Sequence, residues 1–199
     1  QPEWTGFKND VTAQLAQKAT LLKENMEFTI GETGDFNTLS EALEYLSKYQ
    51  NTFKNDGYEV ILRYLPGYRV MEQTTLKDID LSFITLTSTN NEEIPVTVPG
   101  NIIRCYNSKA PNIKLIYDME KNGATGIHLE NGSNIFVHPD CGVKNAGLHG
   151  IHFIQSQGSI LKTIFTGAVG CGVRLTQSSN VTGMGADASY AGLDGFFVT

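Results

Sequence analysis

The stretch Gly126-Ile127-His128-Leu129 recurs three times in the C-terminal half of the chain. The related stretches are Gly150-Ile151-His152-Phe153, Gly172-Val173-Arg174-Leu175 and Gly195-Phe196-Phe197-Val198, and their first residues lie 24, 22 and 23 residues apart. A period of this length is typical of solenoids and repeat arrays. The leucine frame of leucine-rich repeats and the long apolar stripes of ankyrin-type repeats are both missing. Short strands joined by polar turns therefore predict a coil of parallel strands.

Side chains alternate between the two faces of a strand, and this alternation assigns the repeat residues to faces. One inward column is predicted to contain Ile127, Ile151, Val173 and Phe196, and a second Leu129, Phe153, Leu175 and Val198. Each fully buried member would contribute about 1.5–3 kcal/mol. The residue between the two apolar positions must face outward. The predicted outward column is His128, His152, Arg174 and Phe197.

Polar turns and further strands surround these lines. The glycine that opens each line is expected to adopt a turn conformation that a Cβ atom would hinder. A second strand is predicted in each unit, after a turn rich in Gly, Ser and Asn, and starting near Ile135, Ile160 and Val181. Upstream, period-two patterns predict strands at 59–65, 81–87, 94–98 and 113–117.

Two segments near the N-terminus have helical periodicity. Residues 5–25 carry apolar side chains at the spacing of a coiled-coil seam, which Lys18 interrupts. This helix would pack either on its own domain or in a short bundle with copies from other subunits. A second helix is predicted at 39–50, after a capping box made by Thr38 and Glu41. Its apolar face would consist of Leu39, Ala42, Leu43, Leu46 and Tyr49.

The composition argues against several functions. The 199 residues are 40% hydrophobic, which is enough for a buried core, and the formal net charge is -6. An acidic chain without a basic stripe is not expected to bind nucleic acid. No apolar run is long enough to cross a membrane, and the first residues do not resemble a signal peptide. The three cysteines lack Cys-x-x-Cys spacing, so we expect small buried residues without a redox role.

Two segments resemble the first turns of pectin-lyase-like β-helix proteins. Gly34-Asp35-Phe36-x-Thr38-Leu39-x-Glu41-Ala42-Leu43 is similar to the stretch that starts the helix closing the N-terminal end of their solenoid. Val60-Ile61-x-Arg63-x-Leu65-Pro66-Gly67-Tyr68 is similar to their first rung. Together with the Gly-Ile and Gly-Val rungs, these segments make residues 28–199 resemble bacteriophage tailspikes, in particular heparosan lyases of tailspike type.

This resemblance implies an all-β fold: a right-handed parallel β-helix with an N-terminal helix and a short capping helix. It divides the chain into a helical or trimerisation segment (1–27), a cap with the first rungs (28–122) and the β-helix rungs (123–199). It also implies a homotrimer in the tail of the virion. Tailspikes have more rungs, and the sequence stops within a strand pattern. We therefore expect the solenoid, and with it possible catalytic residues, to continue after Thr199, or another domain or partner to cover that end.

The resemblance further implies a depolymerase that acts on an acidic bacterial surface polysaccharide as a lyase. Calcium-dependent lyases of this fold use clustered acidic residues, and because the sequence shows no such cluster we expect no metal or other cofactor. Parallel rungs lie about 4.8 Å apart, so the outward column could contact one ligand. Arg174 would neutralise a uronate carboxylate, and His152 would act as the base that removes the neighbouring proton. His128 would contact the substrate, and Phe197 would stack on a sugar ring. The same four residues could equally form an ordinary solvated surface.

Other functions stay open. A glycoside hydrolase would need two carboxylates about 5–9.5 Å apart. The candidates are Glu130, Asp140, Asp187 and Asp194, of which Asp140 and Asp187 have the surroundings of turn residues. His138 and Asp140 lack a third metal ligand nearby in the sequence, so no metal site is predicted. A non-catalytic attachment module or a trimeric stalk would use the same fold without turnover.

Overall fold

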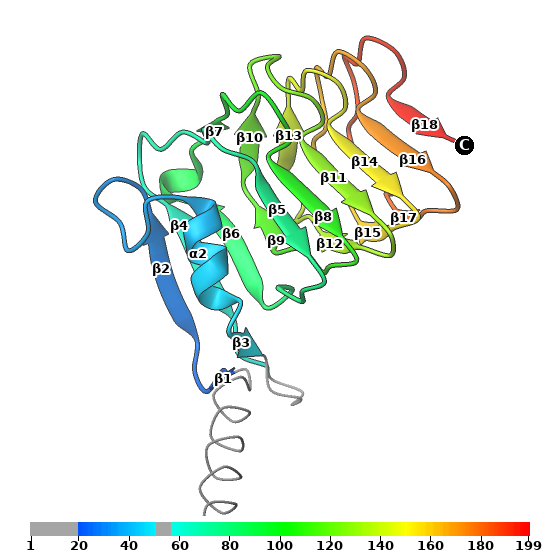
Figure 1. Ribbon diagram of the computed structural model, residues 1–199. Coiled ribbons are helices and arrows are strands. Elements are labelled where there is room, and N and C mark those ends of the chain that lie inside the picture. Colours follow the sequence, from blue (N-terminus) through cyan, green and yellow to red (C-terminus); the bar gives the residue numbers. More distant parts are fainter. Residues whose placement is uncertain (1–19, 51–56) are drawn as a thin grey trace, which may run out of the picture.

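The computed structural model describes residues 20–50 and 57–199, and within them all paired strands are parallel (Figure 1). The strands stack into a right-handed parallel β-helix of about six turns, which confirms the predicted fold class. We call the largest sheet the long sheet. It contains, side by side, β5 (Thr74–Lys77), β8 (Ile103–Tyr106), β11 (Ile127–Glu130), β14 (Ile151–Ile154), β16 (Val173–Thr176) and β18 (Phe196–Val198).

Two further strand faces complete the solenoid. One contains β2 (Met26–Ile30), β4 (Val60–Tyr64), β6 (Ile84–Ser88) and β9 (Asn112–Lys114), followed by β12 (Asn134–Phe136), β15 (Gln157–Ser159) and β17 (Asn180–Thr182). The other contains β7 (Ile94–Pro95), β10 (Ile116–Asp118) and β13 (Gly142–Lys144). The remaining elements are β1 (Thr20–Leu21), α2 (Leu39–Leu46), β3 (Tyr49–Gln50) and the 3-10 helix η1 (Thr89–Asn91). None of the helices in these described ranges has the length and apolar character needed to cross a membrane.

The predicted register of the repeat is confirmed. Ile127 pairs with Ile151, which pairs with Val173, and Val173 pairs with Phe196. The second inward column runs in the same way from β11 to β18. On β11 and β14 both inward side chains are fully buried, because each lies between two further rungs. On β18, which has a neighbouring strand on one side only, Phe196 and Val198 are 47% and 72% exposed.

The repeat also extends upstream of Gly126, which the sequence analysis did not recognise. On β8, Ile103 and Cys105 lie opposite Ile127 and Leu129. Both side chains are fully buried, and all three cysteines of the chain are free. This line does not begin with glycine, so the Gly-Ile pattern does not include it. Ile103 nevertheless precedes Ile127 by 24 residues, so the period alone would have revealed the rung.

The glycines that open the rungs are needed for space and not for a left-handed backbone. Gly126, Gly150 and Gly172 lie in bends directly before their strands, as expected, but they do not have positive φ angles. A Cβ atom would nevertheless be hindered. On Gly126 it would lie 2.6 Å from the carbonyl oxygen of Gly150, and on Gly150 it would lie 2.6 Å from that of Gly172. Left-handed backbone occurs instead at the polar residues that directly follow strands of the long sheet, which are Asp78, Asn107, Asn131, Gln155 and Gln177.

The first predicted helix, at 5–25, lies mostly in residues 1–19, outside the described part of the chain. Its proposed seam and any role in trimerisation therefore stay predictions. The last residues of that range are not helical, because Thr20 and Leu21 form β1 and pair with β3. The amide of Thr20 donates to the carbonyl of Lys48 at 2.7 Å. Strand pairing thus replaces the helical hydrogen bonds at this point.

The second predicted helix is present but shorter than expected. α2 ends at Leu46, and the next residues join β3 instead of continuing to residue 50. Thr38 accepts a hydrogen bond from the amide of Glu41 at 3.2 Å, as predicted. The carboxylate of Glu41 accepts from the amide of Asn37 at 2.9 Å, and not from that of Thr38, so the capping box is only half correct. The buried face is Leu39, Ala42, Leu43 and Leu46.

Several strand predictions are wrong in detail. The strand predicted at 81–87 begins at Ile84, after a turn, and the strand predicted at 94–98 ends at Pro95. Residues 113–117 form parts of two strands, β9 and β10, because the chain turns a corner at the buried Leu115. In the middle repeat unit the second strand is β15, so Gly158 and not Ile160 occupies its stacked position. A larger residue would not fit there, because a Cβ atom on Gly158 would lie 2.7 Å from the ring of Phe153.

Candidate functional site

The outer face of the long sheet carries two columns of side chains. The first contains Thr75, Arg104, His128, His152, Arg174 and Phe197, and we call its part from Arg104 to Phe197 the basic column. The second column, two residues further along each strand, consists of Lys77, Tyr106, Glu130, Ile154 and Thr176. Neighbouring rungs lie about 4.8 Å apart. The four site residues predicted from the sequence are thus in register in the predicted order, and the structure adds Arg104 before them.

Arg104 and His128 hold the carboxylate of Glu130. Nη2 of Arg104 donates a hydrogen bond to Oε1 of Glu130 at 2.9 Å, and Nε2 of His128 lies 2.7 Å from the same oxygen. The contact with His128 lacks the alignment of a hydrogen bond, so it is a close polar contact only. The side chains of His128 and Glu130 are 16% and 19% exposed, so water screens the group poorly. Glu130 therefore neutralises this half of the basic column.

Arg174 and His152 provide a guanidinium and an imidazole like those of Arg104 and His128, but no carboxylate of the described residues is paired with Arg174. Nη1 of Arg174 lies 2.9 Å from Nε2 of His149, and Nε2 of His152 lies 3.2 Å from Oγ1 of Thr176. Within residues 20–50 and 57–199, no acidic side chain forms an ion pair with Arg174, and its buried Nε has no hydrogen-bond partner. Thr176 follows Arg174 at the position where Glu130 follows His128. This half therefore carries an unbalanced positive charge.

His149 is a buried part of this half that the sequence analysis missed. It precedes the strand β14, so no strand pattern pointed to it, and its ring centre lies 5.5 Å from that of His152. Nδ1 of His149 accepts a hydrogen bond from the amide of Cys171 at 3.0 Å. A neutral imidazole has one acceptor nitrogen, so the proton lies on Nε2 and faces the guanidinium of Arg174. Two donors therefore meet there, and an oxygen atom of an anionic ligand could accept from both.

The three clustered imidazoles are neutral at pH 7. Burial, and after it the charges of the neighbouring histidines and Arg174, lowers the pKa of His152 to about 4. Burial also lowers the pKa of His128, although the carboxylate of Glu130 opposes this shift. The pKa of His149 is lowered by burial and then by the guanidinium of Arg174. The arginines carry the charge of the column, and the imidazoles act as neutral hydrogen-bonding groups.

We expect the free energy of unfolding to decrease as the pH falls from 7 to 5. Unfolded histidine binds a proton near pH 6.5, whereas His152 in the folded chain does so near pH 4. The unfolded state therefore takes up more protons in this window, and folded stability that is complete above about pH 6.5 is progressively lost. Urea unfolding at the two pH values measures the loss, and His152→Gln should make it smaller. An equal loss in the variant would contradict the assignment to His152.

Aromatic rings flank both guanidinium groups. The guanidinium carbon of Arg174 lies 5.3 Å from the ring centre of Phe197, and that of Arg104 lies 4.9 Å from the ring centre of Tyr106. Such contacts hold the planar guanidinium against an aromatic face. Phe197 is partly exposed, so some of its ring is accessible to a ligand.

Two further carboxylates considered for a hydrolase, those of Asp140 and Asp187, lie in or next to turns. Asp187 accepts a hydrogen bond from the amide of Ser189 at 2.9 Å, and the hydrogen bonds with Ser189 lower its pKa. Asp140 has a left-handed backbone with φ of 59° at an exposed corner. Both are turn residues, as predicted. Among the hydrolase candidates, Glu130 is the one that belongs to the outer face of the long sheet, where it is already paired with Arg104.

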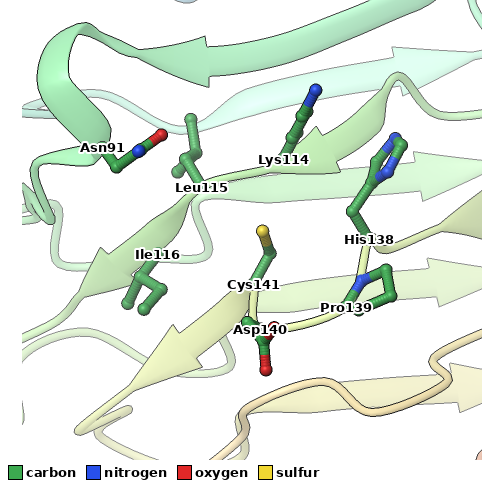
Figure 2. Close-up of a pocket in the computed structure, with 8 residues that line it drawn as sticks. All are labelled: Asn91, Lys114, Leu115, Ile116, His138, Pro139, Asp140 and Cys141. Carbon is green, nitrogen blue, oxygen red and sulfur yellow. The ribbon is translucent and has the colours of Figure 1, made fainter.

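A pocket lies at the corner between β9 and β10, away from the basic column. The chain turns there through the single residue Leu115, while longer turns containing Asn91 and Pro139 lie on the neighbouring rungs. Together they line a pocket of about 510 Å³ (Figure 2). Figure 2 shows the side chains of His138 and Asp140 pointing in different directions, so they do not converge on one ligand. In the described part of the chain, no three His, Cys, Asp or Glu side chains are arranged to hold a metal ion.

No family model matches the chain, and no curated protein matches it. The β-helix itself is compatible with proteins that bind or degrade polysaccharides. We therefore infer the function from the fold together with the geometry of the basic column.

Proposed function

We propose that the outer face of the long sheet binds an acidic polysaccharide, with one sugar carboxylate at Arg174 and His152. The observation that carries this proposal is the position of Glu130. Its carboxylate accepts a hydrogen bond from Arg104 and lies in close polar contact with His128, so the chain itself provides an example of the group that an arginine and a histidine on adjacent rungs of this face accommodate. Arg174 and His152 form a second such pair, and no acidic side chain of the described residues forms an ion pair with Arg174.

The side chains around this pair suit a sugar better than a small inorganic anion. Phe197 continues the column beyond Arg174 and offers a partly exposed ring against which the apolar face of a sugar can pack. Thr176 offers a hydroxyl, and Ile154 an apolar contact, in the second column. Because these groups continue across adjacent rungs of one sheet, they can contact several units of a polymer.

We further propose that this chain is part of a phage tailspike, a homotrimer in the tail of the virion that recognises a bacterial surface polysaccharide. The support for this setting is the resemblance of residues 34–43 and 60–68 to the first turns of such proteins, together with the parallel β-helix. A rigid solenoid presents its outer side chains in a fixed register, which suits recognition of a repeating polymer.

We also propose that a bound uronate is cleaved by β-elimination. Arg174 would pair with the carboxylate and stabilise the charge that develops when the adjacent carbon loses its proton. Nε2 of His152 would accept that proton. The released electron pair would form a carbon–carbon double bond as the bond to the glycosidic oxygen breaks, and that oxygen would take a proton from His152 or water.

One observation favours the second candidate, a binding module without turnover. A general base is most effective when its pKa lies near the working pH, and His152 has a pKa of about 4. Such an imidazole is in its proton-accepting form at pH 7 but is a weak base. A ligand carboxylate nearby would raise this pKa, so the weakness applies to the free protein.

One assay separates the two candidates. The full chain is incubated at pH 7 with a panel of acidic capsule polysaccharides and with dextran as a neutral control. Calorimetry measures binding, and ultraviolet absorbance follows the unsaturated uronate that a lyase produces. We expect binding to an acidic polymer and not to dextran, with rising absorbance for a lyase and constant absorbance for a binding module. Equal binding of dextran, or no binding of any acidic polymer, would contradict the proposed function.

A further inference from the structure

The basic column reads arginine, histidine, histidine, arginine on four consecutive rungs. The two halves contain the same groups in mirrored order, and only the half of Arg104 and His128 contains a carboxylate of the described chain. Resting on the proposed function, we infer that Glu130 is a specificity-determining residue. It limits the face to one ligand carboxylate, bound at Arg174, and so selects polymers whose acidic sugars are separated by at least two neutral ones.

Glu130 does not readily make room for a second ligand carboxylate. Its Oε1 lies 2.9 Å from Nη2 of Arg104 and 2.7 Å from Nε2 of His128, and turning the side chain away would break both contacts. The guanidinium of Arg104 would then lose its charge partner while its buried Nε still lacked a hydrogen bond. With Glu130 in place, a ligand carboxylate would meet a like charge in a poorly screened position.

The spacing of the rungs determines which distances between two ligand carboxylates are disfavoured by this repulsion. Arg174 lies three rungs from Arg104, which corresponds to about 14 Å along the sheet. A second carboxylate that follows the first within this distance would fall beside His128 and Glu130. An uncharged sugar at the same place meets no like charge and can pack against the side chain of Tyr106. A polymer with a carboxylate on every sugar is therefore disfavoured.

Two oligosaccharides of equal length test this rule by calorimetry with the full chain. An oligogalacturonate carries a carboxylate on every sugar, and the second ligand carries a single uronate at one end of an otherwise neutral chain. We expect the unmodified chain to bind the ligand with the single uronate about tenfold more tightly. Glu130→Gln removes the charge and keeps the shape of the side chain. It should strengthen binding of oligogalacturonate about tenfold and change that of the ligand with the single uronate little.

A matched control is Glu27→Gln, which removes the same charge from an arginine pair on another face. Glu27 lies 2.7 Å from Nε of Arg63, and its loss should not change the ratio of the two dissociation constants. Thr176→Glu is a second variant at a partly exposed position, so it does not depend on the folding of Glu130→Gln. It places a carboxylate beside Arg174 and should weaken binding of both oligosaccharides at least about tenfold.

The outcomes distinguish this inference from the function on which it rests. If neither oligosaccharide binds the unmodified chain, the proposed function is wrong. If both bind equally and Glu130→Gln leaves their ratio unchanged, the role of Glu130 is wrong while the proposed function stands. If Thr176→Glu binds both as tightly as the unmodified chain, Arg174 does not hold the ligand carboxylate.

Discussion

Ile151→Asp is expected to unfold the β-helix. Ile151 is fully buried in the first inward column, between Ile127 and Val173 on the neighbouring rungs. The substitution removes apolar burial and places a carboxylate in the core without a charge partner. We expect a loss of about 5 kcal/mol or more. That loss is comparable to the whole folding free energy of many domains, so the variant should be largely unfolded.

Urea unfolding followed by circular dichroism measures this loss. The matched control is Ile154→Asp, the same substitution on the same strand at an outward, partly exposed position. Its cost should be about 1 kcal/mol, because the new carboxylate remains in contact with water. Similar losses for the two variants would show that the inward and outward faces have been assigned incorrectly.

Arg174→Ala is expected to weaken binding of an acidic polysaccharide about 100-fold, equivalent to about 2.7 kcal/mol. The guanidinium of Arg174 is the charged group in the half of the basic column formed by His152 and Arg174. In this half no described carboxylate is paired with the arginine. Its removal leaves His149 and His152 as neutral groups, which bind a carboxylate more weakly. The stacking contact with Phe197 is also lost, so the ring would be less well ordered for a sugar.

Calorimetry with the acidic polymer that binds the unmodified chain measures this effect, and the melting temperature shows that the variant is folded. Arg63→Ala is the control, because Arg63 pairs with Glu27 on another face of the solenoid. It should leave the affinity unchanged. Unchanged affinity in Arg174→Ala would mean that the basic column is ordinary protein surface.

The register of the long sheet could be predicted from the sequence because two independent patterns agree. The alternation of apolar residues assigns the faces, and the recurring Gly-Ile and Gly-Val pairs align the rungs. Where the second pattern is absent, as before Ile103, the rung was missed although the alternation continues. The corner at Leu115 was missed for a different reason. A single buried residue carries the turn, so no polar turn signal interrupts the apolar run.

The basic column could be predicted only in part. His128, His152 and Arg174 follow from the register, but Arg104 depended on the missed rung. Glu130 lies two residues after His128, so the pleat places it on the same face, and the prediction treated it only as a hydrolase candidate. His149 lies outside the strands. Its position against Arg174 results from packing between turns, which a local pattern does not encode.

The pKa of His152 with and without a bound uronate oligosaccharide, measured by nuclear magnetic resonance of the imidazole signals, tests the site most directly. The free value is about 4. A carboxylate bound at Arg174 should raise it above about 5, because a nearby negative charge favours the protonated ring. The pKa of His128, which already lies beside Glu130, should change less. An unchanged pKa of His152 under saturating ligand, or an equal change at His128, would contradict carboxylate binding at Arg174 and His152.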